Sequence, residues 1–197
     1  MRDFSFQQKK STFFDRFIAN LRYSFVYKKL IKTDLSFEKM NICDVGCWYN
    51  GNLLGFLKGK FPNNSFFWVD LSAREDSFFK FVKANFEKDT FSLESESMDL
   101  VCSLAVIEHL NSPDNYLSEI KRILRTGGTC IMTTPSVYGK PVLEFLAYSW
   151  LGNKEEILDH KIYYNKVTLE MIVSKYFQDY NVSYFQFWMN LFLIAKK

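Results

Sequence analysis

The stretch LVCSLAVIEHLNSPDNYLSEIKRILRTGGTCIMTT, residues 100–134, alternates short apolar runs with one helical segment. Residues 100–104 are apolar on both faces, which is typical of a buried parallel strand. The following helix is predicted over 112–125, because its start combines a capping serine, a first-turn proline and an acid near the positive dipole end. We expect the glycine pair 127–128 to stop it. A second strand is predicted over 129–133, so the stretch forms one strand–helix–strand unit.

The same alternation extends to both sides of this unit. Further strands are predicted over residues 40–45, 65–69, 79–84, 181–186 and 190–195, and helices over 52–61 and 168–176. Strands alternating with helices indicate a parallel sheet that is covered on both faces. The last two strands are joined by a short connection and should be antiparallel. We therefore predict a three-layer α/β fold with a mostly parallel seven-stranded sheet and an antiparallel C-terminal strand.

Composition excludes several classes of protein. With 48% hydrophobic and 24% charged residues among 197, the chain is globular and of single-domain size. The net charge of +3 is too mild to predict a nucleic-acid partner. The cysteines, Cys43, Cys47, Cys102 and Cys130, form no C-x-x-C pair, and with two histidines they predict no metal site. Reduced, buried cysteines indicate a cytoplasmic compartment.

The N-terminal segment, residues 1–38, is predicted to be a helical extension of the single domain 1–197. Its helix is expected over 12–31, capped by Thr12, with apolar side chains at helical spacing and basic ones on the other faces. A basic amphipathic helix can lie on an anionic membrane. Packing on the domain with solvated lysines is the favoured alternative. Peripheral membrane contact therefore stays open, as does the choice between monomer and homodimer.

The turns that follow the strands indicate where a ligand binds, because such sheets bind ligands at the carboxyl ends of their strands. The first turn is DVGCWYNG, residues 44–51, in which Gly46 permits a tight reversal and Gly51 a close helix start. Many βα turns contain glycine, so the turn alone is not decisive. Asp70 ends the second predicted strand, and an ionised carboxylate there can accept both hydroxyls of a ribose. Together they favour an adenosine-type ligand over a mere helix cap.

Several motifs form a more specific set. They are SMDLV at 97–101, IEHL at 107–110 and EIKRIL at 119–124 running into GGT, together with DVGC at 44–47. As a set, they resemble the class I S-adenosylmethionine-dependent methyltransferases, in particular the small-molecule branch, over residues 40–136. The resemblance implies a Rossmann-like methyltransferase fold, S-adenosyl-L-methionine as cofactor and a small-molecule methyl acceptor.

The resemblance also assigns cofactor contacts residue by residue. It places the cofactor against Asp44, Gly46, Cys47, Gly51, Asp70, Leu71, Asn85, Phe86, Ser103 and Leu104. Asp70 would hold the ribose diol, and Asn85 stands where the family usually has an aspartate facing the adenine amino group. The turn departs from the family pattern, because Trp48 replaces a glycine and one residue is added. A catalytically silent relative that acts as a binding module is the alternative function. An NAD-dependent oxidoreductase would fit Asp70 but not the other motifs.

Catalytic candidates are few, because a hydroxyl acceptor profits from a base and the chain has two histidines. They are His109, which belongs to the family's acid–histidine pair, and His160, in the segment LDHKIYY. Either is expected to have a pKa near neutrality. A structural hydrogen bond is the alternative for His109. For His160 it is an exposed loop position, unless Asp159 orients the ring and the following tyrosines wall a pocket.

A ring-rich segment over residues 137–164 precedes the last predicted helix, on the side where the ligand is expected. We interpret it as a cover over the acceptor, although some of its rings must belong to the core. Short chains with a D-H-x-x-Y-Y segment resemble methyltransferases of bacterial surface-carbohydrate and lipid pathways. That resemblance makes a sugar or lipid-precursor hydroxyl or amine the expected acceptor.

Overall fold

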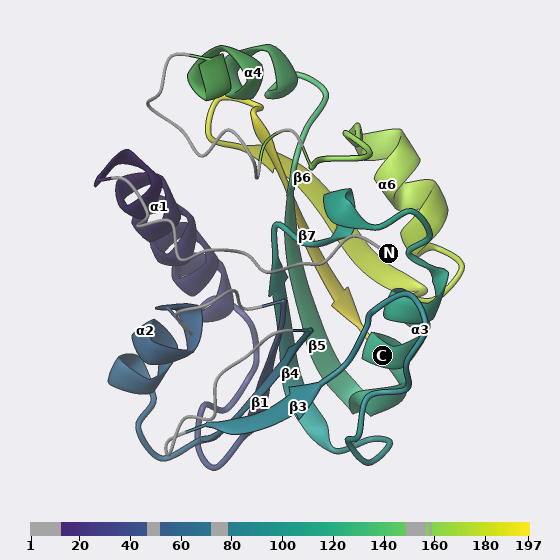
Figure 1. Cartoon of the computed structure of the whole chain (residues 1–197). Helices are drawn as coiled ribbons and strands as arrows, with labels where there is room; N and C mark the ends of the chain where they lie inside the picture. Colours follow the sequence, from purple (N-terminus) through teal and green to yellow (C-terminus); the bar gives the residue numbers. More distant parts are fainter. Residues whose placement is uncertain (1–12, 47–51, 72–78, 149–156, 158) are drawn as a thin grey trace.

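A single mixed sheet organises the molecule (Figure 1). The computed structural model describes residues 13–46, 52–71, 79–148, 157 and 159–197. Its seven strands lie in the order β3-β2-β1-β4-β5-β7-β6. They are β1 (Asn41–Val45), β2 (Ser65–Asp70), β3 (Lys80–Lys83), β4 (Met98–Leu104), β5 (Leu124–Pro135), β6 (Asp179–Phe185) and β7 (Asn190–Lys196). The first five are parallel to one another, and β7 is antiparallel to both β5 and β6, which confirms the predicted fold class.

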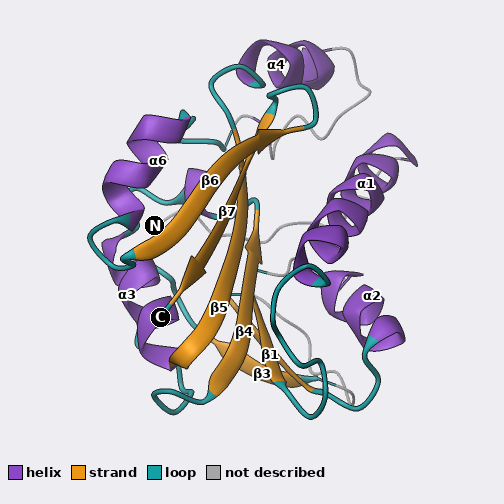
Figure 2. Ribbon diagram, turned by 180° about the vertical axis from the view of Figure 1, so that it is seen from behind, coloured by secondary structure: helices purple, strands orange, loops and turns teal. Residues whose placement is uncertain are grey.

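Helices cover both faces of this sheet (Figures 1 and 2). The helices α1 (Phe13–Leu30) and α2 (Asn52–Lys60) lie on one face, and α3 (Asp114–Ile123) and α6 (Lys166–Val173) lie on the other. Each face has its own cluster of buried apolar side chains. The helix α4 (Lys140–Tyr148) lies beyond one end of the sheet, after β5. The central strands are thereby buried, as their continuous apolar sequence requires.

The described part of α1 packs on the domain. Phe25 stacks on Phe185 with ring centroids 4.4 Å apart and meets Phe192 edge-on at 5.4 Å. Val26 and Leu30 are completely buried. This packing bears out the favoured alternative for that half of the helix, whereas the predicted cap at residue 12 lies outside the described residues. Among the helices that the structure describes, none has the length and hydropathy needed to span a bilayer.

The end of α3 differs from the sequence prediction. The helix stops at Ile123, and β5 begins at once with Leu124, which pairs with Met98 of β4. The glycine pair lies inside β5, where Gly127 has φ 77° and donates its N–H to the Lys197 carbonyl at 2.8 Å. The predicted helix end at 125 and strand start at 129 were therefore wrong. The local sequence does not reveal this, because the hydrogen bonds that hold the extension of the strand come from Lys197, about 70 residues further along the chain.

The cysteines on the central strands are buried thiols, as predicted. Cys43, Cys102 and Cys130 are free and have no exposed surface. Burial raises the pKa of all three thiols, and the nearby Asp44 carboxylate adds to the effect on Cys43 and Cys102. They pack as small apolar side chains rather than acting as nucleophiles or metal ligands. Cys47 lies outside the described residues.

Candidate active site

The tight turn after β1 is built around Gly46. This residue has φ 83°, and its N–H donates to the Val69 carbonyl at 2.8 Å, which joins the ends of β1 and β2. A Cβ at this position would lie 2.3 Å from Cγ2 of Val106. Asp44, two residues earlier in β1, is 2% exposed. Only glycine fits here, because both the backbone conformation and the approach of Val106 exclude a side chain.

We expect Gly46→Ala to lower the free energy of unfolding by about 2–4 kcal/mol, combining left-handed backbone strain with overpacking against Val106. Chemical denaturation of the purified protein measures this. Gly55→Ala is the matched control, because nothing lies within 4 Å of its added methyl group on α2. Adding Val106→Ala to Gly46→Ala should recover part of the loss. Equal free energies of unfolding for Gly46→Ala and Gly55→Ala would contradict the prediction.

Asp70 is where the sequence predicted it, at the last position of β2. Its side chain is half-buried, and its carbonyl accepts the Ala84 N–H at 3.0 Å, which holds the β2 and β3 ends together. The next residue, Leu71, is 42% exposed. A carboxylate fixed at a strand end beside the Gly46 turn fits the acid expected to hold a ribose diol. The other turn residues predicted to contact cofactor, Cys47 and Gly51, lie outside the described residues, as does Trp48.

The loop after β3 contains Asn85 and Phe86. The Asn85 Oδ1 accepts the Glu87 N–H at 3.0 Å, and the Asn85 N–H donates to Asp89 Oδ2 at 2.7 Å. The amide oxygen therefore shapes the loop, and its second lone pair is what a cofactor amino group would use. The half-buried ring of Phe86 packs against Tyr116, with centroids 5.8 Å apart.

The end of β4 is locked to β1. The buried Ser103 Oγ donates to the Val45 carbonyl at 2.7 Å and accepts a hydrogen bond from the Tyr116 hydroxyl. Leu104 is half-buried and ends the strand. The chain then turns through Ala105, which has φ 60° and donates its N–H to the Thr133 carbonyl. This turn leads directly into a short 3₁₀ helix, η2 (Ile107–His109), at the carboxyl end of β4.

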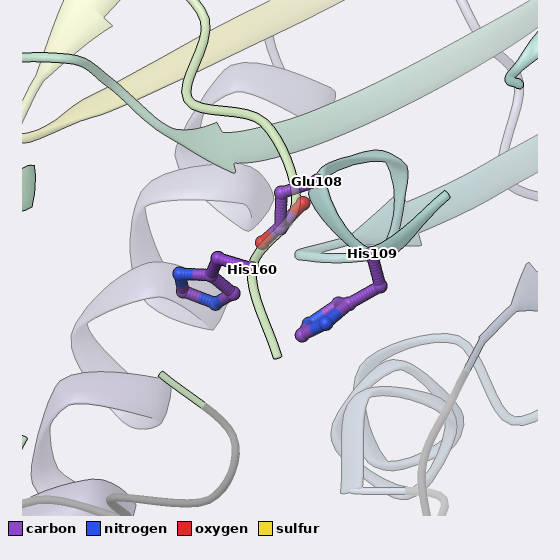
Figure 3. Close-up of side chains that lie close together, drawn as sticks. All are labelled: Glu108, His109 and His160. Atoms are coloured by element: carbon purple, nitrogen blue, oxygen red, sulfur yellow. The ribbon is translucent and has the colours of Figure 1, made fainter. Parts of the chain in front are cut away.

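Both candidate histidines meet at η2. The Glu108 carbonyl accepts the N–H groups of Lys161 and Ile162 at 2.9 and 3.3 Å, which fastens the segment after His160 to η2. As a result, the rings of His109 and His160 lie with centroids 4.8 Å apart, beside the Glu108 side chain (Figure 3). We call Glu108, His109 and His160 the EHH cluster. One ligand atom from each member lies within 4.8 Å of the others.

Hydrogen bonds orient each member of the EHH cluster. His109 Nδ1 lies 3.2 Å from Asp159 Oδ2, and His160 Nδ1 lies 2.9 Å from the Tyr163 hydroxyl. Asp159, which was one possible partner for the His160 ring, lies at His109 instead. The Tyr163 hydroxyl orients the His160 ring. The fully buried carboxylate of Glu108 accepts from the Thr134 hydroxyl at 3.0 Å through Oε2.

The surroundings lower the pKa of both imidazoles. Burial lowers the pKa of His109, although the Asp159 carboxylate counteracts the effect. Burial, with the nearby His109 and Arg22, lowers the pKa of His160 to about 4. The expectation of a near-neutral pKa was therefore wrong for His160, because its ring is removed from water. A neutral imidazole offers one nitrogen lone pair, which can take a proton or bind a cation.

Comparison with known proteins identifies the family of the chain. A family model described as a methyltransferase domain matches residues 17–176. The chain belongs to this methyltransferase family. Its resemblance to class I S-adenosylmethionine-dependent methyltransferases is thereby confirmed, as is the expected class of enzyme and its cofactor.

Individual relatives are more distant. The methyltransferase is 29% identical over 105 residues to a malonyl-(acyl-carrier protein) O-methyltransferase of Paenibacillus sp. (strain JDR-2). That match covers 47% of this chain and 38% of the relative, so the chain spans well under two thirds of that enzyme's length.

Two solved structures resemble the whole fold. One is a methyltransferase complexed with the Haloferax volcanii activator Trm112, with TM-score 0.64 and 15% identity over 96% of this chain and 99% of that chain.

The other solved structure is Haemonchus contortus phosphoethanolamine N-methyltransferase 2 in complex with S-adenosyl-L-methionine. Its TM-score is 0.64 and its identity 16%, over 90% of this chain and 52% of that chain. Identities this low show a shared fold and leave the acceptor open.

Proposed function

We propose that this methyltransferase transfers a methyl group from S-adenosyl-L-methionine to a small-molecule acceptor. The observation that carries the proposal is the shared edge of the sheet. The Gly46 turn, the half-buried Asp70 and the EHH cluster all follow the carboxyl ends of neighbouring parallel strands. A cofactor over the first two features would therefore lie beside the third.

The residues present fit the cofactor. Gly46 leaves no side chain at the reversal after β1, and Asp70 supplies a carboxylate with acceptor atoms only. The backbone at Ser103 and Leu104 would border the methionine part of the cofactor. When bound, S-adenosylmethionine supplies an electrophilic methyl group on a sulfonium, so the protein contributes mainly alignment and the exclusion of water.

A hydroxyl acceptor suits the EHH cluster best, because a hydroxyl must lose its proton during or before attack. Two imidazoles whose pKa is lowered by burial lie at the carboxyl end of β4, and His109 or His160 is the proposed acceptor of that proton. Within this class we propose a sugar or lipid-precursor hydroxyl, and an amine as the alternative. The D-H-x-x-Y-Y segment around His160 supports this choice.

Residues 137–164 are the proposed acceptor cover. They start at the carboxyl end of β5 and return through His160 to η2. Within them, α4 presents Phe145 and Tyr148, which are 69% and 68% exposed. Exposed rings on a helix that follows the carboxyl end of β5 support a role in enclosing an acceptor.

Calorimetric titration tests the cofactor directly. We expect saturable binding of S-adenosylmethionine and of its demethylated product to one site per chain, and no heat with NADH. If neither adenosine ligand binds to protein whose folding has been verified, methyl transfer is excluded. The alternative of a catalytically silent relative would then be favoured.

A further inference from the structure

The EHH cluster contains more than two candidate bases. It brings one buried carboxylate and two imidazoles together from segments about fifty residues apart in the chain. The sequence predicted no metal site, because it contains only two widely separated histidines. We propose that Glu108, His109 and His160 bind one divalent transition-metal cation, with Zn²⁺, Mn²⁺ and Fe²⁺ as the fitting class.

The donor set selects this class of cation. Two imidazole nitrogens and one carboxylate oxygen suit zinc or a first-row transition metal, and such three-ligand sites keep further positions open for water or substrate. Calcium and magnesium prefer a full shell of oxygen ligands, which the cluster does not provide. The chemistry of the donors therefore points to a catalytic-type centre rather than a closed structural one.

The geometry comes close to that of a bound state. Bonds of about 2.0–2.2 Å place the ligand atoms of a tetrahedral site roughly 3–3.5 Å apart. In the cluster these atoms lie within 4.8 Å of one another. The approach still required between the ligand atoms is at most about 1.3–1.8 Å, which rotations of the side chains can supply. Figure 3 shows that the three side chains lie close together, where the segment that contains His160 passes η2.

The surroundings orient the donors as an outer shell of a metal site does. Asp159 lies at Nδ1 of His109 and the Tyr163 hydroxyl at Nδ1 of His160, so Nε2 is the nitrogen that each ring offers to a cation. The Thr134 hydroxyl donates to Glu108 Oε2 and fixes the carboxylate. Carboxylates and hydroxyls bonded to the second nitrogen of a histidine are the partners that metal-binding histidines usually have.

The cation would have a role in the proposed reaction. This part of the inference rests on the proposed function, whereas the site itself does not. An acceptor hydroxyl bound at an open position would have a lowered pKa, because a divalent cation stabilises the alkoxide form. The bound cation would then activate the acceptor as a Lewis acid. His109 and His160 would serve as its ligands instead of as the base, and the proton of the hydroxyl would pass to water.

Cobalt titration of the full chain tests the site. The protein is stripped with a chelator and freed of any histidine tag, and Co²⁺ is added while visible absorption is recorded. We expect one equivalent of Co²⁺ to give d–d bands, and one equivalent of Zn²⁺ to abolish them. The His160→Ala and His109→Ala variants should bind Co²⁺ at least about 100-fold more weakly, since each removes one of three ligands.

Two further variants sharpen the test. Tyr163→Phe removes the outer-shell hydroxyl and should weaken Co²⁺ binding about 10-fold, within the range known for such partners. Glu94→Gln removes an exposed carboxylate outside the cluster and should leave binding unchanged. Thermal unfolding verifies the fold of each variant. If Co²⁺ gives no stoichiometric bands, or if His160→Ala binds it as the parent does, the proposal is overturned. No cofactor is present, so failure here is distinguishable from failure to bind S-adenosylmethionine.

Discussion

Replacing Asp70 by alanine should weaken the binding of S-adenosylmethionine by about 100-fold or more. The reason is the loss of two hydrogen bonds from ribose hydroxyls to an ionised carboxylate, each contributing about 1.5–3 kcal/mol. The half-buried position of Asp70 at the end of β2 strengthens this effect, since water replaces the carboxylate only in part. Calorimetric titration with S-adenosylmethionine and its demethylated product measures the change.

Two companion variants separate binding from folding. Asp70→Asn retains one acceptor oxygen and should fall between the parent and Asp70→Ala. Asp179→Asn neutralises an exposed acid at the start of β6 and should bind like the parent. An Asp70→Ala variant that is folded and binds cofactor as tightly as Asp179→Asn would remove the assignment of Asp70 to the ribose.

Changing either histidine of the EHH cluster to glutamine should reduce the turnover number about 10²–10⁴-fold, the range that a positioned acid–base group contributes. The affinity for S-adenosylmethionine should stay within about twofold of the parent, because the cluster is assigned to the acceptor and not to the cofactor. Methyl transfer from isotopically labelled cofactor to a panel of sugars, hydroxy lipids and amines measures the rate.

The double variant is informative as well. If His109 and His160 act as one unit, His109→Gln with His160→Gln should be hardly slower than the slower single variant. Glu170→Gln, which removes the acid of the Lys166–Glu170 ion pair on α6, is the matched control and should keep full activity. Two single losses that multiply in the double variant would show independent roles, and undiminished turnover in both single variants would exclude the cluster from catalysis.

The strands of the central sheet could be predicted because their signal is local. Residues 100–104 are apolar apart from Ser103, and such a run is typical of a buried parallel strand. The start of β5 could not be predicted, because it depends on the hydrogen bond between the Gly127 N–H and the Lys197 carbonyl, which are far apart in the chain. A glycine pair that ends a helix and one that lies in a strand have the same local sequence.

Part of the candidate site could also be predicted from the sequence. Gly46 and Asp70 followed from the strand ends, where the fold family places its ligands. The partner of Asp159 did not follow, because the neighbour in sequence is His160 and the neighbour in space is His109. The hydrophobic periodicity of the sequence does not show which loops lie side by side. For that reason Glu108 was not predicted as a metal ligand.

The two amides that share the Glu108 carbonyl limit how this enzyme can be re-engineered. The loop after His160 cannot be exchanged freely, because any replacement that does not supply both N–H groups leaves a buried oxygen without its donors. If α4 covers the acceptor as proposed, specificity for a new acceptor is better sought there, because Phe145 and Tyr148 are exposed and their replacement leaves the core intact. We therefore expect α4 to tolerate substitution and the segment that is hydrogen-bonded to the Glu108 carbonyl not to tolerate it.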